Sequence, residues 1–96
     1  MRCMMTIHMD TEAGNKAITD GTLPKLMQQL MERVQPEASY FTADGGTRAA
    51  FLFFDLADPS DLPVITEPAF MGLNAKIGFS PVMNLDDLQK GLAKLS

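Results

Sequence analysis

The sequence is poor in the residues on which many common sites depend. Its 96 residues include no tryptophan, one cysteine, one histidine and one tyrosine. A single cysteine cannot form an internal disulfide, which is typical of a chain kept in a reducing compartment. With one histidine and scattered carboxylates we expect no metal site, because transition metals need clustered ligands. No glycine-rich phosphate loop or dinucleotide turn occurs either, and we expect no bound cofactor.

An excess of positive charge and a long apolar run are also missing. The net charge is −4 and the isoelectric point about 4.7, which argues against nucleic acid or an anionic membrane as partner. The longest apolar run, Ala49–Phe54, is far shorter than the ~20 residues of a membrane span. The start reaches Asp10 too soon for a secretory signal. We therefore expect a cytoplasmic protein.

What is present is the ordinary balance of a globular chain, with 46% hydrophobic and 21% charged residues. The length predicts a single domain spanning residues 1–96. Apolar residues alternate over Arg2–Met9, which predicts a strand, and recur at helical spacing over Ala13–Val34. Gly21 and Pro24 interrupt this helix, so either one helix kinks there or a second begins with Thr22 as its cap.

The remaining segments complete a repeating order of strands and helices. We predict strands at Glu37–Ala43, Thr47–Asp55 and Ala75–Met83, and helices that begin at Asp58 and at Asn84 or Asp86. The tripeptide Asp44-Gly45-Gly46 predicts a tight hairpin between the first two of these strands. The order predicts an α+β, ferredoxin-like βαββαβ fold plus a C-terminal helix, with helices on one face of a four-stranded antiparallel sheet. We expect the first and third strands to lie side by side in the middle and to run parallel.

Both faces of this sheet carry large apolar side chains. A two-residue hairpin turn sets Phe41 opposite Ala50 and Ser39 opposite Leu52. Helices can cover only one face, and leaving Leu52 and Phe54 in water would forgo ~1.5–3 kcal/mol each. We therefore expect a second subunit to cover the face away from the helices, with Leu52 and Phe54 on it. Two alternatives stay open: the C-terminal helix folds over that face, or the two faces are assigned the wrong way round.

Three short stretches resemble a known family: Pro36–Phe41, Gly46–Arg48 and Glu67–Phe70. With the strand order, they look like the dimeric α/β-barrel superfamily, and within it a group of small bacterial proteins of unknown function. The resemblance implies a homodimer packed sheet to sheet around a central cavity. Members of the superfamily include muconolactone isomerases, cofactor-free quinol-type monooxygenases and haem-degrading enzymes. The haem-degrading kind uses a tryptophan, which this chain lacks, so we do not expect that activity.

His8 and Glu37 are the candidate catalytic residues. Histidine is the side chain that ordinarily changes charge near neutral pH. The expected parallel pairing of the first and third strands brings Glu37 to the end of the sheet where His8 lies. The fourth strand is expected to run antiparallel to the first, so Lys76 begins at the same end. A carboxylate that orients an imidazole could support proton transfer. The alternative is that all three side chains are simply solvated at a wet end of the sheet.

A further set of side chains is expected to line a ligand site between two sheets. We expect Arg48 at the same end of the sheet as Arg2, opposite His8. There it could hold a carboxylate by a bidentate contact, or pair with an acidic residue across the dimer. A bend at Pro68 could aim Glu67 into the cavity, although glutamates on helix surfaces are mostly solvated. Tyr40 is expected to be a core residue and Cys3 a small buried one. The full ligand-binding set is Thr6, Ser39, Phe41, Arg48, Leu52, Phe54 and Glu67.

Two functions are compatible with these features. The first is a homodimeric α/β barrel that binds a small hydrophobic or aromatic acid between its sheets, as a cofactor-free isomerase or monooxygenase. The second is a non-catalytic binding or interaction module whose sheet face is only a dimer interface. A ligand-sized cavity between the two sheets would separate the first from the second.

Overall fold

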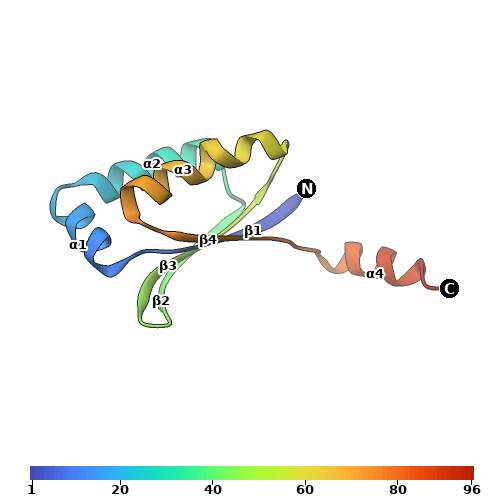
Figure 1. Cartoon of the computed structure of the whole chain (residues 1–96). Helices are drawn as coiled ribbons and strands as arrows, with labels where there is room; N and C mark the ends of the chain where they lie inside the picture. The colour runs from blue at the N-terminus through green and yellow to red at the C-terminus, as the bar shows by residue number, and fades with distance from the viewer.

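The computed structural model describes all residues, 1–96, as four strands and four α-helices (Figure 1). The strands pair into one sheet, and three of the helices lie together on one side of it. The elements are β1 (Arg2–His8), α1 (Thr11–Thr19), α2 (Thr22–Val34), β2 (Ala38–Asp44), β3 (Thr47–Asp55), a 3-10 turn η1 (Pro59–Asp61), α3 (Leu62–Leu73), β4 (Lys76–Pro81) and α4 (Leu85–Ala93).

The ends of the helices follow the local sequence. The carboxylate of Asp10 accepts a hydrogen bond from the Ala13 amide and caps α1. Two separate helices form, not one kinked helix, because Gly21 adopts a left-handed φ of 79° between them. The alternative of a second helix placed Thr22 as its cap. The cap is instead Gly21, and Thr22 is the first residue of α2. Asn74, with a left-handed φ of 46°, is the residue at which α3 ends.

The sheet has the strand order β2-β3-β1-β4, and every neighbouring pair is antiparallel. This order fits a ferredoxin-like fold, as the sequence predicts. The prediction that β1 and β3 run parallel is wrong. The helical crossover makes β1 and β2 parallel, and the tight hairpin then reverses the chain, so β3, which lies between them, runs against both.

The core lies between the sheet and α1, α2 and α3. Leu52 and Phe54 are 0% and 2% exposed and pack with side chains of α2 and α3, such as Leu30 and Ile65. The prediction that Leu52 and Phe54 lie on the uncovered face is therefore wrong, and the alternative that the faces were exchanged is correct. Alternation alone could not decide this point, because β3 is apolar on both sides.

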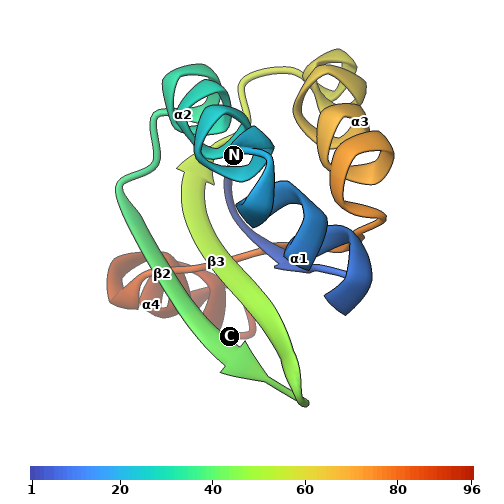
Figure 2. The same cartoon turned by 90° about the vertical axis from the view of Figure 1, so that its left-hand side faces the viewer.

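The opposite side of the sheet, here called the open face, has no helix over it (Figures 1 and 2). Cross-strand pairing and strand alternation place thirteen residues on it, besides Arg2, Thr47 and Asp55 at its ends. They are Met4, Thr6, His8, Ala38, Tyr40, Thr42, Asp44, Ala49, Phe51, Phe53, Lys76, Gly78 and Ser80. Met4, Tyr40, Phe51 and Phe53 therefore form an apolar group on this face, among polar and charged neighbours. The prediction that both faces of the sheet carry large apolar side chains is confirmed.

The C-terminal helix α4 does not fold over this face. It lies beyond the end of β4, away from the other helices (Figure 1), and none of its residues is buried. The longest dimension of the molecule is accordingly 55 Å. No helix in the structure combines the length and the apolar character that crossing a bilayer requires.

Candidate functional site

His8 lies at the last position of β1, next to the turn of the β2–β3 hairpin. It pairs across the sheet with Ala49, which pairs in turn with Thr42 of β2. The carboxylate of Asp44, two residues further along β2, therefore reaches the ring, and its Oδ2 lies 2.9 Å from His8 Nε2. A carboxylate only accepts hydrogen bonds, so in the neutral imidazole Nε2 donates and Nδ1 keeps its lone pair. His8 is thus oriented as a proton acceptor that projects from the open face.

Polar and aromatic groups surround this pair on the same face. Lys76 is the cross-strand partner of His8 on β4 and is exposed. The ring of Phe51 meets the imidazole edge to face, with centroids 6.3 Å apart. Thr6 pairs with Gly78, and a Cβ at that glycine would lie only 3.0 Å from the Thr6 hydroxyl oxygen. The absence of a side chain at Gly78 therefore leaves the hydroxyl of Thr6 open from the β4 side.

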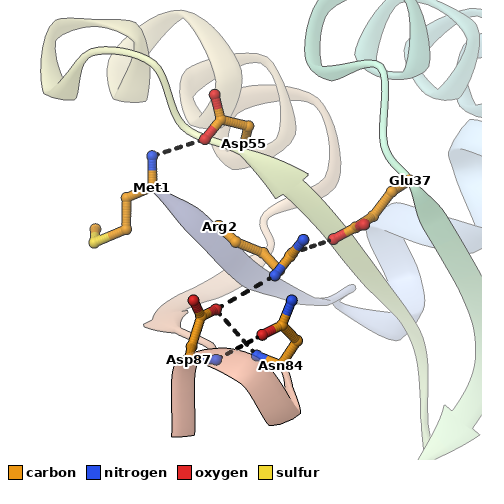
Figure 3. Close-up of polar contacts among 6 residues, drawn as sticks. All are labelled: Met1, Arg2, Glu37, Asp55, Asn84 and Asp87. Carbon is orange, nitrogen blue, oxygen red and sulfur yellow. Dashed lines mark hydrogen bonds and ion pairs between the residues drawn. The ribbon is translucent and has the colours of Figure 1, made fainter. Parts of the chain in front are cut away.

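Glu37 lies at the opposite end of the sheet, so the prediction that it joins His8 is wrong. Its Oε1 accepts a hydrogen bond of 2.8 Å from Nε of Arg2, which is six residues from His8 along β1 (Figure 3). At about 3.4 Å per residue this separates the two ends by about 20 Å. Glu37 therefore holds the N-terminal end of β1, whereas the carboxylate beside His8 is Asp44.

The same end of the sheet holds the start of α4. The guanidinium of Arg2 also lies 3.6 Å from a carboxylate oxygen of Asp87 (Figure 3). Asp87 and Asn84 form a capping box, in which each side chain accepts from the other residue's amide. Arg2 thus joins the beginning of β2 to the beginning of α4.

The predicted ligand-binding residues are divided between the two sides of the sheet. Only Thr6 lies on the open face. Leu52 and Phe54 belong to the core, and Glu67 is exposed on α3 and lines none of the hollows of the molecule. Ser39 and Phe41 lie on the helix side of the hairpin. Ser39 is half-buried, whereas Phe41 is 57% exposed because no helix reaches it.

Arg48 was expected at the end of the sheet where Arg2 lies, but antiparallel pairing places it at the end where His8 lies. Its Nη2 donates to the Asn15 side chain of α1 at 2.9 Å. A Cβ at Gly14 would come within 2.8 Å of Nη1, so the bare backbone of α1 makes room for the guanidinium. Arg48 therefore ties α1 to β3.

Tyr40 and Cys3 complete the comparison with the sequence. Tyr40 is not a core residue: it is 64% exposed on the open face, and its ring meets Phe53 edge to face at 6.5 Å. Cys3 is buried as predicted, and desolvation raises the pKa of its thiol above the ordinary range.

The sequence analysis missed Asp44 as the carboxylate partner of His8. The available signal was its place in the hairpin turn, because antiparallel pairing brings that turn to the end of β1.

The hollows of the monomer all lie away from the open face. The smallest, about 50 Å³, lies between α2 and α3, beside Leu30 and Pro68. Two larger ones, of about 220 and 380 Å³, share Phe54 and Asp55 at the other end of the sheet from His8. A fourth, of about 200 Å³, lies on the outer side of α2 beside Arg33. The group around His8 therefore lies on an unenclosed surface of the single chain.

Known proteins add no assignment to this geometry. Comparison of the chain with protein-family models, with curated proteins and with solved structures found no match in any of the three. The described side chains include no group of three or more His, Cys, Asp or Glu residues arranged to hold a metal ion. The chemistry of the site therefore has to be inferred from its own residues.

Proposed function

We propose that this protein binds a small aromatic or hydrophobic acid on its open face and transfers a proton within it, as a cofactor-free isomerase does. One observation carries the proposal. A carboxylate-bound imidazole lies in one row with a lysine and beside an aromatic ring, on a face that has no cover within the chain. Aromatic surface and a cation are the two features that recognise such an acid.

Each part of the ligand has a counterpart on this face. The apolar part would lie on Phe51 and Tyr40, which pair across β2 and β3. The ligand carboxylate would meet the ammonium group of Lys76 in a charge-assisted hydrogen bond. His8 Nδ1 would accept the proton while Asp44 holds the ring and stabilises the imidazolium that forms.

A homodimer is the second part of the proposal. Apolar side chains that gather on one exposed surface are typical of an interface, and Met4, Tyr40, Phe51 and Phe53 are neighbours on the open face. Two open faces stacked about 10 Å apart would exclude water from each other and enclose the group around His8. Sedimentation equilibrium should then give twice the 10.5 kDa chain mass at micromolar concentration. A stable monomer would contradict this part.

Ligand binding is tested with benzoate as the probe and benzyl alcohol as its uncharged counterpart. NMR titration should shift the amide signals of Thr6, Phe51 and Lys76 with benzoate and much less with the alcohol. Lys76→Gln should weaken benzoate binding at least tenfold, since a hydrogen bond to a charged group contributes ~1.5–3 kcal/mol. Gly78→Val should abolish it, because the new side chain fills the space beside Thr6.

Two results would count against the site. One is no benzoate-dependent shift at millimolar concentration, and the other is binding that Gly78→Val leaves unchanged. One observation favours the second function, a dimerisation module: no hollow of the monomer opens on the open face. A dimer that binds neither probe would support that module instead.

A further inference from the structure

The helix α4 has an apolar side with no partner in its own chain. Leucines recur along it at spacings of three, four and three residues, which places them on one side of a helix. They are between 40% and 82% exposed. This leucine stripe consists of Leu85, Leu88 and Leu92 of α4 and of Leu95 in the turn that follows.

The start of α4 is fixed in a direction that leads away from its own sheet. The amide of Val82 donates to the carbonyl oxygen of Arg2 and extends the pairing of β4 with β1. The capping box of Asn84 and Asp87 then begins the helix, and Asp87 meets the guanidinium of Arg2 (Figure 3). As a result, the radius of gyration is 15.3 Å, against about 12.5 Å for a compact chain of this length.

We infer that α4 of each copy docks its leucine stripe on the open face of a second copy of this chain and closes one end of the space between the two sheets. The inference rests on the homodimer proposed above. A second copy is the occupant that supplies both missing surfaces at once, because it offers an uncovered apolar sheet and an unpartnered apolar helix. In a twofold dimer each copy gives one helix and receives one.

The area of contact supports this exchange. Four strands about 4.8 Å apart and about 24 Å long give a face of about 450 Å², whereas a stable interface needs about 800 Å² per partner. A nine-residue helix is about 14 Å long and about 10 Å wide with its side chains. The received helix covers part of the same sheet face, so only the given helix adds area, and the contact comes to about 600 Å² per partner, at the lower end of the range for specific interfaces.

The position of α4 is tested by photo-crosslinking in the full chain. A benzoylphenylalanine placed at Leu88 should give a covalent dimer on irradiation, with linked peptides that join α4 to β2 or β3. The same probe at Ala93, which lies off the leucine stripe, should give at least tenfold less. A link formed within one chain would mean that α4 folds back on its own sheet, and that result, like no link at all, would overturn the inference.

A matched pair of substitutions tests how much the leucine stripe of α4 contributes to the stability of the dimer. Leu92→Lys and Ala93→Lys add the same charge at neighbouring positions, but only the first interrupts the stripe. The dimer dissociation constant should rise at least tenfold in the first variant and less than twofold in the second. Equal constants in both variants would overturn the inference. Both variants should remain folded, since no residue of α4 is buried.

The same measurements separate this inference from the proposed homodimer. If the unmodified protein is a monomer, both fail together. If it is a dimer that neither crosslinks through position 88 nor weakens in Leu92→Lys, the stacked sheets remain and only the docking of α4 is refuted. If both α4 experiments succeed while benzoate does not bind, the docking stands without the ligand site.

Discussion

Two neighbours on β3, Phe51 and Leu52, point to opposite sides of the sheet and should respond differently to truncation. Leu52 is 0% exposed in the core. Leu52→Ala should cost about 3 kcal/mol, for the lost transfer free energy and the cavity that remains. The free energy of unfolding of a chain of 96 residues is only about 5–14 kcal/mol, so the loss is a large fraction of it. The melting temperature should fall by about 12–24 °C.

Phe51 is half-buried, and within the chain it meets His8 edge to face. Phe51→Ala should therefore cost only about 1 kcal/mol in the monomer. Its effect should grow with protein concentration, because a dimer interface stabilises the folded state by mass action. The effect of Leu52→Ala should stay the same.

Urea unfolding followed by circular dichroism would measure both variants at one concentration well below and one well above the dimer dissociation constant. The assignment of the two faces is refuted if Leu52→Ala costs less than Phe51→Ala at the lower concentration. The proposed interface loses its support if the cost of Phe51→Ala is the same at both concentrations. Ile77→Val serves as the control, because it removes one methyl group on the core side of the edge strand β4. Its expected cost in the free energy of unfolding is about 0.5–1.5 kcal/mol.

Three further predictions concern single positions. Burial keeps the Cys3 thiol protonated to a higher pH than in the unfolded chain, so stability should fall as the pH rises above about 8.5, and Cys3→Ala should flatten this fall in urea midpoints. Gly46 has a φ of 82° in the hairpin turn, so Gly46→Ala should cost about 1 kcal/mol in the same assay. Gly91→Ala in α4 should instead increase helicity, because Gly91 has open space around it and no positive φ.

The hairpin was fully predictable because local chemistry determines it. Gly45 and Gly46 both adopt positive φ, which a two-residue turn requires and which side chains disfavour. With the turn fixed, the pairing of Phe41 with Ala50 follows by counting, and the structure has that pairing. The caps at Asp10 and Asn74 are local in the same sense.

Longer-range features were harder to predict. The direction of β3 relative to β1 depends on how a crossover and a hairpin combine, and an error there exchanged the two ends of the sheet. Glu37 was consequently placed beside His8, while Lys76, whose position depends only on the pairing of β4 with β1, was placed correctly. The covered face could not be read from β3, since Phe51 and Leu52 are both large and apolar. That choice depends on where α1, α2 and α3 pack.

The strand β2 has a neighbour on one side only. Its backbone amides and carbonyls on the other side are free to pair with a strand of another molecule, and the segment from Ala38 to Asp44 contains no lysine or proline to prevent this. Mutual repulsion from the net charge of −4 then becomes the main protection against fibrous association. Acidification toward the isoelectric point of about 4.7 removes that repulsion, so mildly acidic solutions are where this protein should aggregate.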